Sequence, residues 1–275
     1  VRQLHRAIER LGEGDFATPI VVAGTHDLET IGGRLDWLRK RLFTLDREKV
    51  RMLAHISHEL KTPLSSIKEG AGLLKDGLVG PLSRSQIEIV TIMDSNCRKL
   101  QKLIQNILDF NMAQAREAPL DLEDIRLDQL IEDVAGDHRN AMLARTIQLT
   151  LQLKPAKVSG ASSQLKTALD NLLGNAVKFT QEGGSIGVFM KLKANRVNVV
   201  IEDNGPGISE EDQAQIFQPF YQGKQQGQSP VKGSGLGLAI SREYVENSGG
   251  TLRLLPSSHG ARFSMTLPRA AEEAP

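Results

Sequence analysis

An exposed histidine next to a glutamate is the first group in this chain that could do chemistry. His58 and Glu59 lie in the helical stretch 54–64, where Ile56 and Leu60 share one face and His58 points away from it. A neutral imidazole nitrogen is nucleophilic near pH 7, and a neighbouring carboxylate can accept its proton. An isolated His-Glu pair on a coiled coil is usually an ordinary surface feature, so its meaning depends on the rest of the chain.

Pro63 follows this pair after one helical turn. Proline cannot donate a hydrogen bond to the carbonyl of Glu59, and its ring crowds that carbonyl, so we expect the helix to bend there. Thr62 lies just before the expected bend, on the side of the helix that carries His58.

A second group of polar side chains lies on a predicted helix around residues 170–180. Asn171, Asn175 and Lys178 fall at positions i, i+4 and i+7, so two amides and an ammonium line one face while apolar side chains line the other. Amide oxygens can bind Mg²⁺, and an ammonium can meet phosphate. An amphipathic helix with a polar outer face would explain the pattern equally well.

A predicted strand ends at Asp203 and leads directly into Gly205 and Gly207. Glycines suit a place where backbone must approach a flat ligand closely, and the carboxylate could accept a hydrogen bond from an exocyclic amine. A surface turn is the alternative interpretation.

A second glycine-rich stretch opens a predicted helix. Its glycines are Gly233, Gly235 and Gly237. Glycines at a helix start present backbone N–H groups and a positive dipole end to phosphate. A loop precedes this stretch, whereas a Rossmann fingerprint needs a strand there and a different glycine spacing; there is also no Walker A pattern.

The elements that must position His58 are helices with apolar seams. From Asp27 a seam with alternating spacings of three and four predicts a left-handed coiled coil: Leu28, Ile31, Leu35, Leu38, Leu42 and Leu45. After a turn at residues 76–83, with Ser83 as the expected N-cap, another seam passes through Cys97, which we therefore expect to be a core residue. The apolar stripe is too long for one hairpin to cover, so we expect a dimeric four-helix bundle; a monomeric hairpin packed on another part of the chain is the alternative.

The ends of this helical region differ from its middle. Residues 1–12 predict a short helix, followed by an extended connector with Phe16 and Ile20 as apolar anchors. Beyond residues 115–119 the seam stops and the pattern changes to that of an α/β domain. Six strands are expected there, near residues 124–127, 146–153, 185–192, 197–202, 251–254 and 262–267.

Composition limits the possible functions. The chain has 275 residues, with 34 basic and 33 acidic side chains and 4% aromatic residues, so nothing favours nucleic acid as a partner. One cysteine excludes an intrachain disulfide and multi-cysteine metal sites. No apolar run approaches the roughly eighteen residues that span a bilayer. Because the chain begins at Val1 within a helix and without a methionine, we expect an upstream part to be missing.

Taken in order, five motifs resemble the H, N, G1, F and G2 boxes of sensor histidine kinases. They read His-Glu-Leu-Lys-Thr-Pro-Leu, Asn-x-x-x-Asn, Asp-x-Gly-x-Gly, Phe-x-Pro-Phe and Gly-x-Gly-x-Gly, and with their flanks they cover about residues 50 to 268. The N-terminal helix, connector and seam resemble a HAMP signal-relay linker, with an ordinary helical hairpin as the alternative.

The resemblance implies a fold and a division of the chain. The fold would be multidomain: a helical coiled coil and dimeric four-helix bundle, followed by a two-layer α/β sandwich of the Bergerat (GHKL) type. The expected parts are a truncated HAMP-like linker (1–46), a dimerisation and histidine-phosphotransfer hairpin (47–116), an ATP-binding catalytic domain (117–269) and a disordered tail (270–275).

The resemblance also implies roles for single residues. His58 would accept the phosphoryl group, Glu59 would take or orient its proton, and Thr62 would orient water for dephosphorylation. Asn175 would be the Mg²⁺ ligand. The remaining residues expected to contact ATP are Asn171, Lys178, Asp203 (the adenine-reading carboxylate), Gly205, Gly207, Tyr221, Gly233, Gly235 and Gly237.

The function implied is autophosphorylation of His58 from Mg-ATP and transfer to an aspartate on a response regulator, which the same protein would also dephosphorylate. The chain would be a homodimer and the cytoplasmic portion of a bacterial inner-membrane sensor, attached through a missing upstream transmembrane segment. A Bergerat-fold ATPase or a nucleotide-binding scaffold without kinase activity is the alternative. One departure is Gln222, where the family often has arginine; Lys224 is the expected source of the missing charge.

Overall fold

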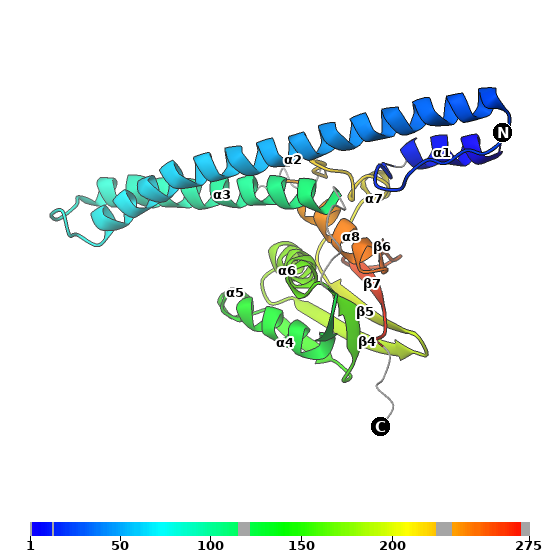
Figure 1. The fold of residues 1–275 in the computed structure, drawn as a ribbon. Coiled ribbons are helices and arrows are strands. Elements are labelled where there is room, and N and C mark those ends of the chain that lie inside the picture. The colour runs from blue at the N-terminus through cyan, green and yellow to red at the C-terminus, as the bar shows by residue number, and fades with distance from the viewer. Residues whose placement is uncertain (1, 13, 115–121, 224–232, 271–275) are drawn as a thin grey trace. The chain divides into compact units, whose positions relative to one another are not determined.

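The computed structural model describes residues 2–12, 14–114, 122–223 and 233–270 (Figure 1). The chain divides into two units, Val1–Glu117 and Ala118–Pro275. Within these described residues, no helix has the length and apolar character needed to cross a membrane. Lys224, the expected source of the missing charge, lies outside the described part. So do residues 271–275 of the expected tail.

The described residues of the first unit form three helices. They are α1 (Arg2–Gly12), α2 (His26–Lys75) and α3 (Arg84–Gln114). The predicted coiled-coil helix and the helix that carries His58 are therefore one element, α2 (Figure 1). Pro63 lies inside α2, and the helix continues beyond it to Lys75, so any bend at the proline does not break the helix.

The connector between α1 and α2 is held to α2 by a buried arginine. Arg39 donates through Nη1 to the carbonyl of Phe16 at 2.5 Å and through Nε to Asp36 at 2.8 Å, and Asp36 accepts from the backbone of Ile20 at 3.1 Å. The hydrogen bond from Arg39 holds the pKa of the Asp36 carboxyl well below its usual range. Phe16 and Ile20, expected to be apolar anchors, are thus both held to α2 through their backbone groups.

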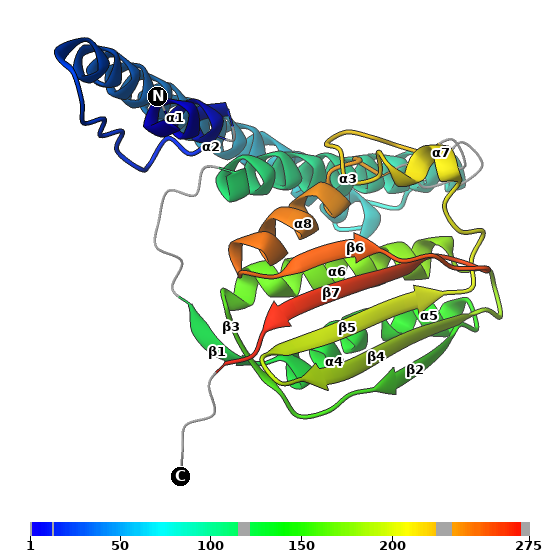
Figure 2. The ribbon, with the colours of Figure 1, turned by 90° about the vertical axis from the view of Figure 1, so that its right-hand side faces the viewer.

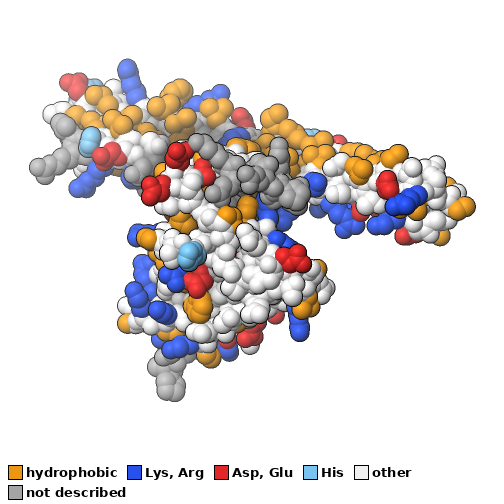
Figure 3. Space-filling model, turned by 180° about the vertical axis from the view of Figure 1, so that it is seen from behind, with side chains coloured by type: hydrophobic (Ala, Val, Ile, Leu, Met, Phe, Trp, Pro, Cys, Tyr) orange, Lys and Arg blue, Asp and Glu red, His pale blue; other side chains and the backbone are white. Residues whose placement is uncertain are grey.

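The hairpin of α2 and α3 buries half of its apolar seam positions over residues 60–71 and 90–100. Leu64, Ala71, Val90 and Cys97 are buried between the two helices, as expected for Cys97. The alternate seam positions are 42–46% exposed: Leu60, Ile67, Met93 and Leu100. Figure 3 shows hydrophobic side chains gathered along this helical unit. A single hairpin therefore leaves an apolar stripe open to solvent.

The predicted N-cap of α3 is confirmed. Ser83 Oγ accepts from the backbone of Gln86 at 3.4 Å, and the Gln86 side chain accepts from the backbone of Ser83 at 2.8 Å. This reciprocal pair is a capping box, and it satisfies two backbone donors at the start of the helix.

The second unit is a two-layer α/β sandwich, as the resemblance implied. Its main sheet has the order β2-β4-β5-β7-β6, with β2 and β4 parallel and the other neighbours antiparallel. The strands of this sheet are β2 (Gln148–Gln152), β4 (Ser185–Lys193), β5 (Arg196–Asp203), β6 (Thr251–Leu254) and β7 (Arg262–Pro268). A small antiparallel sheet joins β1 (Glu123–Arg126) to β3 (Lys157–Gly160).

Helices cover one face of the main sheet (Figure 2). They are α4 (Leu127–Asp137), α5 (Arg139–Ala144), α6 (Ser162–Phe179) and α8 (Gly237–Asn247); a single turn, α7 (Glu210–Gln213), lies outside this layer. The register aligns Val188 with Ile201 and Ile201 with Phe263, so neighbouring strands present matching apolar rows. The apolar face of α6 packs on these rows through its fully buried Leu165, Leu169, Leu172 and Leu173.

Six strands agree with the sequence prediction, and one was missed. Strand β3 has four residues, of which only Val158 is a buried apolar side chain, so the sequence carries almost no alternating signal there. The expected tail also begins one residue too early. Ala270 is 8% exposed, and its amide donates to Lys157 at 3.0 Å, so it belongs to the folded unit.

Gly260 gives a test of how tightly the loop between β6 and β7 is packed. Its φ is +70°, and a Cβ there would lie 1.7 Å from the carbonyl oxygen of Asp203; Gly249 has φ +68°, but its Cβ would meet only Pro268 at 3.7 Å. We expect Gly249→Ala to cost about 1–2 kcal/mol for the left-handed backbone alone. Gly260→Ala should cost at least about 1–3 kcal/mol more, because backbone must move. Urea unfolding followed by circular dichroism measures both, and equal midpoints would contradict this packing.

Candidate active site

His58 is displayed on α2 as the sequence predicted. Its side chain is 79% exposed, and that of Glu59 is 66% exposed, with 3.6 Å between Nδ1 and Oε1. The hydroxyl of Thr62 donates to the backbone carbonyl of His58 at 3.4 Å. The imidazole is therefore open to an incoming group, with a carboxylate beside it and a hydroxyl one turn away.

The polar face of α6 carries Asn175 and Lys178, both partly exposed beside a buried apolar face. Lys178 Nζ lies 4.8 Å from the ring centre of Phe179. A Cβ on Gly233 would lie 3.5 Å from the same Nζ. Burial lowers the pKa of the Lys178 ammonium. The structure thus brings together two predicted groups, a lysine charge and the start of the second glycine stretch.

Asn171 links α6 to α8. Its Nδ2 donates to the carbonyl of Gly237, the first residue of α8, at 3.2 Å, and a Cβ on Gly237 would lie 3.2 Å from Asn171 Oδ1. The hydroxyl of Ser241 on α8 adds a second link, because it lies 3.4 Å from the carbonyl oxygen of Ala168 on α6. The same hydroxyl lies 2.8 Å from the carbonyl oxygen of Gly237 within α8. One amide of the predicted pair therefore holds two helices together, while Asn175 remains available on the polar face.

Asp203 ends β5 with one oxygen engaged. Oδ1 accepts from the backbone of Gly205 at 2.9 Å and of Ala261 at 3.2 Å. Burial raises the pKa of the Asp203 carboxyl above its ordinary value of 3.8, and the two backbone amides oppose this rise. Within the described residues both of these hydrogen bonds fall on Oδ1, which leaves Oδ2 able to accept from a ligand.

The loop after Asp203 has little room for a Cβ at its two glycines. A Cβ on Gly205 would lie 2.7 Å from the carbonyl oxygen of Phe179, and one on Gly207, whose φ is +77°, would lie 3.1 Å from that of Gly260. Glycine is required at both positions, so the loop can pack closely between the end of α6 and the β6–β7 loop.

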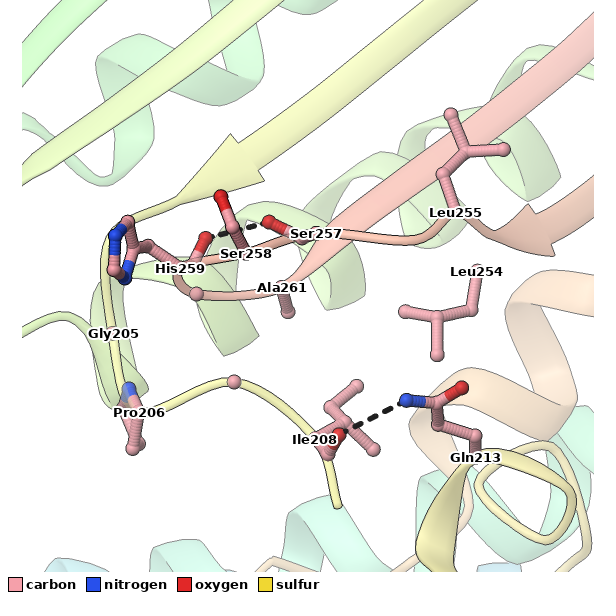
Figure 4. Close-up of a pocket in the computed structure, with 12 residues that line it drawn as sticks. Gly205, Pro206, Ile208, Gln213, Leu254, Leu255, Ser257, Ser258, His259 and Ala261 are labelled. Atoms are coloured by element: carbon pink, nitrogen blue, oxygen red, sulfur yellow. Dashed lines mark hydrogen bonds between the residues drawn. The ribbon is translucent and has the colours of Figure 1, made fainter. Parts of the chain in front are cut away.

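A pocket of about 360 Å³ lies on one side of this loop (Figure 4). Residues 205–208 form one wall of the pocket and residues 257–261 form another. Gln213 also lines the pocket, and its side chain donates to the carbonyl of Ile208 at 3.2 Å. The polar residues of α6 do not line this pocket. Of the residues predicted to contact ATP, Gly205 and Gly207 line this pocket, so the pocket is only partly made of them.

The F-box segment is fixed by its own contacts. Phe217 packs edge-on against Phe263, with 6.3 Å between ring centres. The hydroxyl of Tyr221 donates to the buried Asp212 carboxylate at 2.6 Å, and this hydrogen bond raises the pKa of the tyrosine. Tyr221 was expected to contact ATP, whereas the structure gives its hydroxyl a protein partner.

Gln222 donates to the carbonyl of Gly233 at 2.8 Å, so it bridges the two sides of the segment 224–232. Gly235, with φ +72°, packs against this same region, since its Cβ would lie 2.6 Å from the carbonyl carbon of Phe220. All three glycines of the second stretch therefore have close neighbours from elsewhere in the unit.

Sequence reasoning missed three residues that hold this site together. They are Arg145, Asn204 and Asp212. Arg145 and Asp212 act on groups 35 and 9 positions away, so no local spacing marks them. Asn204 lies inside the Asp-x-Gly-x-Gly motif, and its position alone was a signal that could have singled it out.

The donor set can be compared with what Mg-ATP requires. Among the described residues there is no group of three or more His, Cys, Asp or Glu side chains that could hold a metal ion. Mg²⁺ accepts one or two protein oxygens when substrate phosphates and water supply the rest. The amide oxygen of Asn175, near the Lys178 charge, fits that requirement.

Comparisons with known proteins agree with this architecture. Residues 48–116 match the His Kinase A (phospho-acceptor) domain, and residues 160–271 match the histidine kinase-, DNA gyrase B-, and HSP90-like ATPase family. A helical phospho-acceptor region followed by an ATPase region of this type defines a class of signalling protein. The chain belongs to the sensor histidine kinases.

Individual relatives support the same family. Sensor histidine kinase GlrK of Escherichia coli K12 is 40% identical over 259 residues, which is 94% of this chain and 54% of GlrK. The chain thus spans about half the length of this relative. Full-length ShkA in complex with AMPPNP is similar in structure, with a TM-score of 0.69 and 28% identity over 82% of this chain and 47% of ShkA. Histidine kinase ThkA in complex with response regulator TrrA shares the fold, with a TM-score of 0.58, 22% identity and coverage of 83% and 65%.

Asp203 can be tested by Asp203→Asn. The pKa of Asp203 is raised in the folded state, so ionising this carboxyl at a pH above that pKa lowers the stability of the fold. This loss of stability disappears at a pH below the pKa of the unfolded chain. The neutral amide of Asp203→Asn avoids it, so the melting temperature of the variant at pH 7 should be unchanged or higher. A hydrogen bond to a charged acceptor is worth about 1.5–3 kcal/mol, so affinity for AMPPNP should fall about 10- to 100-fold. Calorimetric titration measures this, with the exposed Asp124→Asn as control. Unchanged affinity would refute the assignment of Asp203.

Proposed function

We propose that this chain transfers the γ-phosphoryl group of ATP to His58 and then to an aspartate on a response regulator. The observation that carries the proposal is the exposed imidazole, with Glu59 beside it, inside the region that matches the phospho-acceptor family. A histidine buried in a core could not reach two different partners, whereas this one is open on its outer side.

ATP binding is supported by the ATPase family match, and ShkA, a similar structure, is in complex with AMPPNP. In our proposal Asp203 accepts from the adenine amine, and Lys178 and the N–H groups near Gly237 face the phosphates. Asn175 would hold Mg²⁺, which would neutralise phosphate charge. Asn171 and Tyr221 then act mainly through the protein contacts described above.

The proposed reaction has two transfers. An imidazole nitrogen of His58 attacks the γ-phosphorus, the bond to the β,γ-bridging oxygen breaks, and ADP leaves with that electron pair. Glu59 accepts the proton from the other ring nitrogen, which removes positive charge as the N–P bond forms. An aspartate carboxylate of the regulator then attacks the phosphorus, and the N–P bond breaks.

We also propose the arrangement in which this occurs. Residues 1–46 act as a HAMP-like linker, 47–116 as the phosphotransfer hairpin and 117–269 as the catalytic domain. The exposed half of the seam supports a homodimer, since a second hairpin would bury Leu60, Ile67, Met93 and Leu100. Attachment to a bacterial inner membrane through an upstream segment follows from the family resemblance.

The acceptor can be identified with two histidines on one helix. His55 is exposed on α2 one turn before His58, so it is a matched control. With labelled Mg-ATP we expect acid-labile, alkali-stable label on wild type and His55→Ala, and a loss of at least about 100-fold in His58→Ala because the nucleophile is gone. Asn175→Ala should reduce labelling while leaving His58 in place. Label of this kind that persists in His58→Ala would contradict the proposal.

Thr62 is proposed to serve dephosphorylation of the regulator. Thr62→Ala should slow loss of phosphate from a phosphorylated regulator about 10- to 100-fold while leaving autophosphorylation within about twofold, because only hydrolysis needs an oriented water. Thr44 also donates to a carbonyl four residues earlier, at 3.0 Å, so Thr44→Ala controls for loss of that hydrogen bond. Regulator decay that is the same in both variants would reject the role of Thr62.

A further inference from the structure

Arg145 follows α5 and reaches the far end of α6. Its Nη1 donates to the carbonyls of Val177 and Lys178, the latter at 3.3 Å, and its Nη2 donates to the carbonyl of Thr180 at 2.6 Å. Val177 and Lys178 are in the last turn of α6, where carbonyls have no partner within the helix, and Thr180 is the C-cap residue that follows it. One guanidinium therefore closes the C-terminal end of the helix that carries Asn175 and Lys178.

Charge and shape both favour this contact. The C-terminal end of a helix carries a partial negative charge, which a cation stabilises. A guanidinium presents several N–H groups in a fixed plane, so it can hold diverging carbonyls that a single ammonium could not hold together. Lys178, also in the last turn, points its ammonium over Phe179 instead.

The backbone of Arg145 is fixed as well. Its carbonyl accepts from Gly183 at 3.0 Å, and the amide of Ile147 donates to the carbonyl of the buried Met142 at 2.9 Å. Thr146 has φ +54°, a left-handed conformation that costs about 1–2 kcal/mol for a residue with a Cβ. Arg145 thus projects from a tight turn whose two sides are both hydrogen-bonded.

The end of α6 packs against the loop that follows Asp203. Gly184 lies between Thr180 and Asn204, since a Cβ there would be 2.5 Å from Thr180 Cγ2 and 2.6 Å from Asn204 Oδ1. Asn204 Oδ1 also accepts from the amide of Ser185 at 2.9 Å. A shift of the end of α6 would therefore be transmitted to Asn204 and, through Phe179, to Gly205.

We propose that Arg145 is a positioning residue for nucleotide binding. By holding the last turn of α6, it sets the separation between the phosphate-facing groups on α6 and the adenine-facing carboxylate of Asp203. This inference rests on the proposed function, in which the nucleotide lies between those two groups. Arg145 acts through Val177, Lys178 and Thr180, and it touches neither the phosphates nor the base.

The test uses the whole chain and AMPPNP. Arg145→Ala removes the guanidinium, and Arg145→Lys keeps a cation that cannot hold all three carbonyls; Arg139→Ala removes an exposed arginine from the first turn of the neighbouring α5 and is the control. Binding is titrated at a temperature at which circular dichroism shows every variant folded. We expect the Kd to rise about tenfold or more in Arg145→Ala, by less in Arg145→Lys, and by under twofold in Arg139→Ala.

A purely structural role would give a different result. Arg145→Ala and Arg145→Lys would then lower the melting temperature, but the folded protein would bind AMPPNP with the wild-type Kd, and that outcome would overturn the inference. If Arg145→Ala does not fold, Arg145→Lys alone decides between these outcomes. A wild-type chain that does not bind AMPPNP would instead reject the proposed function on which this inference rests.

Discussion

Packing of the apolar face of α6 on the sheet is the interaction on which the catalytic unit depends. Leu165, Leu169, Leu172 and Leu173 are all at most 1% exposed, and each buried side chain of this kind contributes about 1.5–3 kcal/mol. Because a helix places its faces at fixed angles, burying this face forces Asn175 and Lys178 to the opposite side. The polar face is therefore positioned by hydrophobic packing, and its direction needs no polar contact to define it.

In the helical unit the corresponding constraint is an apolar seam, of which one chain buries only a part. The hairpin uses Leu64, Ala71, Val90 and Cys97 internally and leaves their neighbours in the seam exposed. In the dimer that we propose, a second hairpin would cover these exposed positions. The position of His58 lies away from the seam, so covering the seam with a second hairpin does not require covering the imidazole.

The parts that the sequence predicted are those governed by local spacing. Heptad spacing predicted the long helices, short apolar stretches predicted six strands, and a serine between the turn and the next helix predicted the cap at Ser83. The contact of Asn171 with Gly237 joins residues 66 positions apart, and Arg145 reaches Thr180 across 35 positions, so neither leaves a local pattern. Strand β3 was missed for a related reason: it is defined by its partner β1 more than by its own side chains.

Gln222 stands where the family resemblance led us to expect an arginine, and its neutral amide makes a hydrogen bond within the protein. The sequence suggested a missing cation at this point, but the amide of Gln222 donates to the carbonyl of Gly233, a hydrogen bond that needs no positive charge on the donor. Gly233 is also the residue beside which the ammonium of Lys178 lies. A positive charge is therefore already present at this end of the segment, supplied from α6, and the residue after Tyr221 is free to serve as a hydrogen-bonding link.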